Sequence, residues 1–232
     1  MNKKLFLILL YTTLFTLTMS GQKKFEPEWN IGVGFGPTFS SVDFVRSSMS
    51  GSPFATKNWQ QYHGGLAVRY ITENHLGLIA ELNYSQQGWI QDFPDNPEYA
   101  HKHQLSYLEL PILTHIYFGR KVRYFINLGP KLSYLINDKE TISDALSEYL
   151  ASGNASASMV THQYYRKAEK KIDYGLTAGM GLEFRTGIGN FTLEGRYNFG
   201  FADIFNNRKS DYFSRSANRV ISAKLTYYIK AF

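Results

Sequence analysis

Segment 173–185 alternates, residue by residue, between two kinds of side chain. Its odd positions are polar, charged or glycine, and its even positions are apolar. A period of two places successive side chains on opposite faces of a β-strand, so the pattern predicts a strand with one polar and one apolar face. The same alternation returns at 76–84 and 191–201. We therefore expect a sheet whose two surfaces differ in character.

The N-terminus has the features of a secretory signal. Two lysines near the start precede an uncharged apolar run over residues 5–19 and small residues up to Gly21, which predicts a cleaved signal over residues 1–21. No later stretch approaches the roughly 20 apolar residues that a spanning helix needs. Residues 22–232 then form one domain of about 210 residues, enough for one barrel. The chain has no cysteine, so we expect neither a lipoprotein anchor nor a disulfide.

The charge of the chain bears on its partners. The formal net charge is +6, and about +4 once Lys3 and Lys4 leave with the signal. An exported protein does not meet nucleic acid, so we expect no nucleic-acid partner. A basic surface could instead face outer-membrane lipid, in particular the phosphates of lipopolysaccharide. A mild excess of positive charge without any partner is the alternative.

Eight strand-like segments follow one another along the mature chain. They are expected at about 30–40, 61–72, 76–89, 105–118, 123–136, 173–185, 191–204 and 218–230. The connections alternate between short (73–75, 119–122 and 186–190) and long (41–60, 90–104, 137–172 and 205–217), and a short helix is expected at 143–150. This layout predicts an all-β fold: a transmembrane, eight-stranded, antiparallel up-and-down β-barrel with short periplasmic turns and long extracellular loops in the bacterial outer membrane.

The alternation would also fit a soluble, lipocalin-like barrel with its apolar face inward. Two observations favour an apolar exterior. Glycines share the charged face, as expected where side chains crowd a narrow lumen. Aromatic residues gather near strand ends, where the two interfacial girdles of a membrane barrel lie. These aromatic residues are Trp29, Tyr70, Tyr84, Trp89, Phe118, Tyr124, Tyr134, Phe184, Phe191 and Tyr227.

Three segments carry a resemblance to a known family. They are NIGVGFGPTFS at 30–40, YLELPIL at 107–113 and the terminal aromatic strand YYIKAF at 227–232. Together they resemble the PorT-like outer-membrane β-barrel domain family of Gram-negative bacteria, over essentially the whole mature chain. The resemblance implies an eight-stranded outer-membrane barrel, and a founding member of that family serves the secretion of surface proteins. Lys230 departs from the family pattern, which usually has an aromatic or apolar residue there.

Two prolines fall inside predicted strands. Pro111 and Pro130 cannot donate a backbone hydrogen bond to a neighbouring strand. We therefore expect β-bulges at these positions, with a local change in which residues face the lumen.

Charged residues of both signs are assigned to the lumen by the alternation. They are Arg69, Glu81, Glu109, Arg123, Lys131, Glu183, Arg185, Glu194, Arg196 and Lys224. An eight-stranded barrel has an interior wide enough only for its own side chains, so these charges should pair and form a structural polar network. The functional alternative is a proton or ion path, or a site of paired carboxylates.

The loops offer two further candidate sites. His101 and His103 lie near Asp92, Asp95 and Glu98 in the sequence, but two histidines without a third fixed ligand are a weak metal signal. We expect an ordinary solvated loop there, with no metal and no cofactor. Basic and aromatic residues that could bind a partner are Trp59, Arg166, Lys167, Lys170, Lys171, Arg208 and Arg215. The alternative is that they cap the barrel mouth and touch lipid headgroups.

Two classes of function remain open. The leading hypothesis is a non-enzymatic integral outer-membrane barrel that serves as a scaffold or binds a partner through its extracellular loops, with an accessory role in protein secretion implied by the resemblance. The alternative is an enzyme barrel that acts on lipid A or surface peptides. That alternative needs a nucleophile, a base and an orienting residue, and the sequence shows no such triad. A diffusion channel conflicts with the small strand number.

Overall fold

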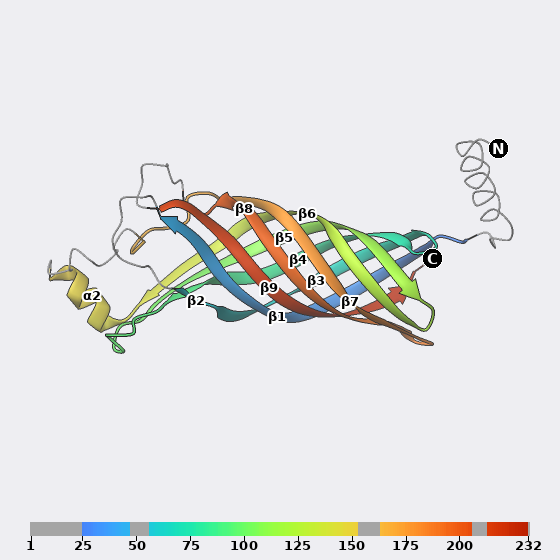
Figure 1. Ribbon diagram of the computed structural model, residues 1–232, viewed down its shortest axis with the longest axis horizontal. Helices are drawn as coiled ribbons and strands as arrows, with labels where there is room; N and C mark the ends of the chain where they lie inside the picture. Colours follow the sequence, from blue (N-terminus) through green and yellow to red (C-terminus); the bar gives the residue numbers. More distant parts are fainter. Residues whose placement is uncertain (1–24, 47–55, 153–162, 206–212, 232) are drawn as a thin grey trace, which may run out of the picture.

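Eight long antiparallel strands close into a barrel in the computed structural model (Figure 1). The structure describes residues 25–46, 56–152, 163–205 and 213–231, so the predicted signal segment lies outside the described residues. The long strands are β1 (Glu28–Arg46), β3 (Trp59–Glu73), β4 (Leu76–Gln91), β5 (His101–Gly119), β6 (Val122–Ile142), β7 (Ile172–Thr186), β8 (Gly189–Asp203) and β9 (Phe213–Lys230). A short strand, β2 (Thr56–Lys57), pairs with the end of β4.

Each long strand pairs with its sequence neighbour, and β1 pairs with β9 to complete the ring. Asn30 pairs with Lys230 across this junction, so the start of β1 lies beside the end of β9. The short turns lie at the same end of the barrel as the C-terminus, which we call the turn end (Figure 1). Helix α2 (Asp144–Ala151), capped by Ser143 as the sequence predicts, lies at the opposite, long-loop end.

Several strands run further than the alternation predicts. β5 and β6 have 19 and 21 residues, because His101 and the segment up to Ile142 belong to strands rather than to loops. A tilted strand needs about 9–11 residues to cross a bilayer. The hairpin of β5 and β6 is therefore longer than a bilayer crossing needs, and it extends past the other strands at the long-loop end (Figure 1).

The apolar face of the sheet is the outside of the barrel. In β6, Leu128 is 55% exposed, whereas its neighbour Asn127 is 1% exposed and faces the lumen. From Val122 to Ile136, the outward side chains of this strand are apolar or aromatic, and they include Pro130. Beyond Ile136 the outward side chains are polar. An apolar exterior around a polar lumen rules out the lipocalin arrangement and fits a barrel surrounded by lipid.

Aromatic pairs lie on the outer surface near the strand ends. At the turn end, Trp29 stacks on Tyr70 with ring centroids 4.4 Å apart, and Phe191 lies 4.8 Å from Tyr227. These rings occupy the place of an interfacial girdle. Trp89 is an exception to the prediction: its side chain is fully buried inside the barrel, because β4 continues to Gln91 with Trp89 facing inward.

The expected bulges at the prolines are absent. The pairing of β5 with β6 keeps one register from Tyr107 to Gly119, past Pro111, and Pro130 pairs in register with Leu176. The register shifts instead between Ser106 and Tyr107, where β6 contains one additional residue, Ile136. The prediction was wrong in position because each proline here interrupts single hydrogen bonds without inserting a residue.

The position of the lipid band can be tested with one substitution at two depths of β6. We expect Leu128→Arg to lower the free energy of unfolding from lipid vesicles by about 2–4 kcal/mol, because it puts a charge on the lipid face at mid-bilayer. Thr141→Arg, on the same strand but beyond the apolar band, should cost less than about 1 kcal/mol. Equal costs at both positions would contradict the assigned band.

Candidate functional site: the lumen and the long-loop end

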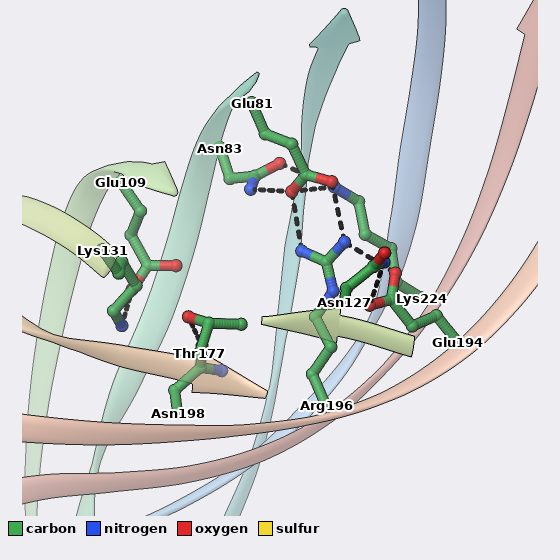
Figure 2. Close-up of polar contacts among 10 residues, drawn as sticks. All are labelled: Glu81, Asn83, Glu109, Asn127, Lys131, Thr177, Glu194, Arg196, Asn198 and Lys224. Carbon is green, nitrogen blue, oxygen red and sulfur yellow. Dashed lines mark hydrogen bonds and ion pairs between the residues drawn. The ribbon is translucent and has the colours of Figure 1, made fainter. Parts of the chain in front are cut away.

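Glu81 on β4 is the centre of the polar network in the lumen (Figure 2). Its two carboxylate oxygens accept hydrogen bonds from Nη1 and Nη2 of Arg196, each at 2.7 Å, and from Lys224 Nζ, also at 2.7 Å. Asn83 Nδ2 adds a fourth bond at 2.8 Å. Arg196 also binds Glu194 at 2.7 Å, so two buried acids and two buried bases share one cluster.

Two smaller ion-pair groups lie on either side of this cluster. Lys131 Nζ lies 2.6 Å from Glu109, which also accepts a bond from Gln87. Nearer the turn end, Glu183 lies 2.8 Å from Arg69 and 3.6 Å from Arg123. Burial without a partner would make each of these charges costly, so their pairing explains how a polar interior is stable.

One residue assigned to the lumen lies elsewhere. Arg185 is about one third exposed at the turn-end mouth, where it lies 3.4 Å from Glu28. Arg185 lies near the end of β7, at the rim of the barrel. The alternation shows which face of a strand a side chain is on, but it does not show where the interior ends and the rim begins. The other nine charges assigned from the sequence lie inside the barrel, with Arg123 closest to the mouth.

The side chains fill the cross-section of the lumen. A cavity of about 10 Å³, bordered by His63, Glu109, Lys131 and Arg196, has room for roughly one water. At Gly179 a Cβ would lie 2.2 Å from the Glu194 carboxylate, so this glycine provides the space that the network occupies. Around this cavity, the described part of the lumen is packed with its own residues.

A buried apolar cluster lies above the polar network, toward the long-loop end. It consists of Val42, Trp89, Leu105, Tyr107, Leu135, Ile204 and Phe205. The alternation does not predict this cluster, because it places Trp89 in an outer girdle and Phe205 in a loop. The cluster closes the interior at this end with apolar side chains.

His101 and His103 lie beside this cluster, and the prediction of a solvated loop was wrong. Both side chains are fully buried on β5. His101 Nε2 lies 2.8 Å from Glu140 Oε1, and His103 Nε2 lies 2.6 Å from Asp138 Oδ1. The partners therefore come from β6. The acids near them in sequence lie apart: Asp92 pairs with Lys57, and Asp95 and Glu98 are exposed.

The extra residue in β6 explains these partners. Below the bulge, odd-numbered residues such as Leu135 face the lumen, whereas beyond Ile136 the even-numbered Asp138 and Glu140 turn inward. A bulge shifts the alternation by one residue and thereby changes the face to which each later side chain points. Without the bulge, these two carboxylates would face outward.

The last part of the longest connection, residues 163–168, covers the histidines. The ring of Tyr164 lies 4.9 Å from that of His101, and the backbone N–H groups of Tyr165 and Ala168 donate to Glu140 and Asp138. Burial raises the pKa of the Tyr164 phenol to about 12, so it remains a neutral donor to Gln91. The segment is thus tied directly to the carboxylates.

The residues proposed for partner binding are spread over this end of the barrel. Lys167, Lys170 and Lys171 are exposed, whereas Arg166 pairs with Glu169 and lies over the Phe205 ring. Two residues assigned to loops belong to strands: Trp59 begins β3, and Arg215 lies in β9 with its guanidinium 5.9 Å from the Phe199 ring. Arg208 lies outside the described residues.

The sequence model of the family described as "Outer membrane protein beta-barrel domain" matches residues 21–206. The chain belongs to this family. Its location is accordingly the bacterial outer membrane, and the long-loop end is the extracellular end. Among the described residues, no helix is long and apolar enough to cross a membrane. Comparison with curated proteins found no match.

Solved structures of other outer-membrane barrels are similar to this chain at low sequence identity. OprG from Pseudomonas aeruginosa is 12% identical with a TM-score of 0.50, covering 88% of this chain and 93% of that chain. Neisserial surface protein A is 10% identical with a TM-score of 0.45, covering 89% and 100%. Ail, the attachment invasion locus protein of Yersinia pestis, is 13% identical with a TM-score of 0.42, covering 87% and 99%. At 12% identity, the likeness to OprG shows the fold alone.

The contribution of the lumen network to the free energy of unfolding can be measured with a pair of matched substitutions. Glu81→Gln leaves Arg196 and Lys224 without a shared counter-charge in a buried site, and we expect it to lower the free energy of unfolding by about 3–5 kcal/mol. Glu28→Gln removes the partly exposed pair at the mouth and should cost less than about 1 kcal/mol. Urea unfolding from lipid vesicles measures both. A Glu81→Gln barrel as stable as the Glu28→Gln barrel would contradict the structural role of the network.

Proposed function

We propose that this protein is a non-enzymatic integral outer-membrane barrel that acts as a scaffold or binding partner through its extracellular end. The observation that carries the proposal is the packed lumen around Glu81 and Arg196. Since the interior is occupied and the outer face contacts lipid, the extracellular end is the largest surface left for recognition.

The chemistry of that end favours an anionic partner. Lys167, Lys170 and Lys171 are exposed along one connection. Lys102 and Lys139 point outward on β5 and β6, just beyond the apolar band that ends near Ile136. Lysines that lie just outside the apolar band of a membrane barrel can contact the phosphates of lipid headgroups. We therefore propose lipopolysaccharide phosphates as the first partner of this surface.

The histidines argue against the enzyme alternative. A triad base must accept the proton of a nucleophile while its second nitrogen is held by an orienting residue. His101 and His103 each use Nε2 for a carboxylate, and among the described residues Nδ1 of each has no hydrogen-bond partner. Neither histidine therefore holds a serine or threonine hydroxyl of the described residues.

An accessory role in protein secretion is a narrower proposal. It depends on the resemblance of segments 30–40 and 107–113 to the PorT-like family, and on export by a cleaved signal over residues 1–21. Crosslinking of intact outer membranes, with the barrel as bait, would test it. Recovery of secretion components in proportion to the barrel would support the role, and their absence from the crosslinked products would count against it.

The lipopolysaccharide proposal can be tested by neutralising lysines at either end of the barrel. We expect Lys167→Gln, Lys170→Gln and Lys171→Gln together to weaken lipopolysaccharide binding by detergent-solubilised protein at least tenfold at low salt and less at high salt, because the lost interaction is screened. The control is Arg120→Gln with Lys121→Gln, which removes exposed charge at the turn end. If the control weakens binding equally, or if the triple variant binds normally, the proposed surface is wrong.

The packed lumen also predicts that the barrel does not conduct ions. In planar bilayers the purified barrel should show no steady conductance, because the Glu81 network and the apolar cluster above it fill the cross-section. Stable, ion-selective current steps from verified monomeric barrels would contradict this prediction and favour a channel.

A further inference from the structure

The extracellular end contains a compact set of potential metal ligands that the proposed function does not use. One nitrogen each from His101 and His103 and one carboxylate oxygen from Glu140 all lie within 4.8 Å of one another. Ligand atoms around a tetrahedral zinc ion, with bonds of about 2.0–2.2 Å, lie roughly 3.3 Å apart. Small side-chain movements would therefore bring these three atoms to coordination distance.

The hydrogen bonding of the histidines is incomplete. Both rings are fully buried, and within the part of the chain that the structure describes, Nδ1 of each has no partner. His101 Nε2 faces the Glu140 carboxylate, so an ion shared by these two residues would bind Nε2 in place of that hydrogen bond. In His103, when Nε2 carries the proton donated to Asp138, the lone pair of the ring lies on Nδ1. A buried nitrogen lone pair without a donor is costly, and a bound cation would satisfy it.

The surroundings hold the ligands in place. His101 and His103 are two residues apart on β5, so they share one face of a strand, and Glu140 pairs with His103 across the hairpin. Trp89 stacks on His103 with centroids 4.5 Å apart, and the Tyr165 N–H donates to Glu140 at 3.1 Å. Ligands fixed by strands, aromatic packing and backbone hydrogen bonds are typical of built metal sites.

We propose that His101, His103 and Glu140 bind one divalent transition metal ion, with Zn²⁺ as the best match to two imidazoles and a carboxylate. Asp138 is a positioning residue: its hydrogen bond to His103 sets the ring orientation, as carboxylates bonded to metal-binding histidines do in zinc sites. The ion would tie β5 to β6 beneath the segment that covers them. The competing interpretation is a pair of histidine–carboxylate hydrogen bonds that holds no ion.

Zinc binding to the full-length barrel, refolded in detergent and checked for heat-modifiable mobility, separates these interpretations. Calorimetric titration with Zn²⁺ alone should give one ion per chain for the native sequence. His101→Gln and His103→Gln should each weaken binding at least tenfold, and so should Glu140→Gln. Asp138→Asn should weaken binding about 10–100-fold. His63→Gln, which removes a buried histidine from the lumen, is the matched control and should bind Zn²⁺ normally.

Co²⁺ provides a readout that does not depend on any variant. The native barrel should show the intense visible absorption of four-coordinate Co²⁺, and an equimolar amount of Zn²⁺ should abolish it. Absence of stoichiometric Zn²⁺ binding by the folded native barrel would overturn the proposal. Unchanged binding in a folded His101→Gln, His103→Gln double variant, or equal loss in His63→Gln, would also overturn it.

Discussion

The closed ladder of backbone hydrogen bonds is the constraint on which the rest of this structure depends. Hydrocarbon offers no partner for an unpaired N–H or C=O group, so a sheet can cross a bilayer only if it has no free edge. The pairings of β1 with β9 and of β4 with β5 supply that closure. Closure with eight strands in turn fixes a narrow interior, and the apolar face must point outward to lipid.

The lumen then takes the place that an apolar core has in a soluble protein. Its charges cannot reach bulk water, so their stability depends on mutual pairing. Glu81 illustrates this dependence, because one carboxylate accepts bonds from Arg196, Lys224 and Asn83, which come from three strands. Glycine at position 179 leaves room for the neighbouring carboxylate of Glu194. Electrostatic pairing and steric fit act on the same few positions.

The sequence predicts the membrane-spanning part well and the extracellular part poorly, for a physical reason. Between Val122 and Ile136, lipid requires an apolar side chain at nearly every outward position, and the alternation records that requirement. Beyond the bilayer the requirement ends, so the extensions of β5 and β6 read as loops. The inserted Ile136 has no local signature, and without it the inward direction of Asp138 and Glu140 could not be inferred.

The bulge also links the two regions. It occurs where the outward apolar residues of β6 end, so a change of alternation there exposes no charge to lipid. The same shift deeper in the strand would turn Lys131 outward into the bilayer and bring apolar side chains such as Leu132 into the lumen, at a cost of several kcal/mol. The extracellular extension is therefore the part of the barrel where strands can place new polar side chains inward. This extension contains His101, His103 and Glu140. Backbone hydrogen bonds between β5 and β6 hold these residues in place, but lipid does not restrict which side chains can occur there.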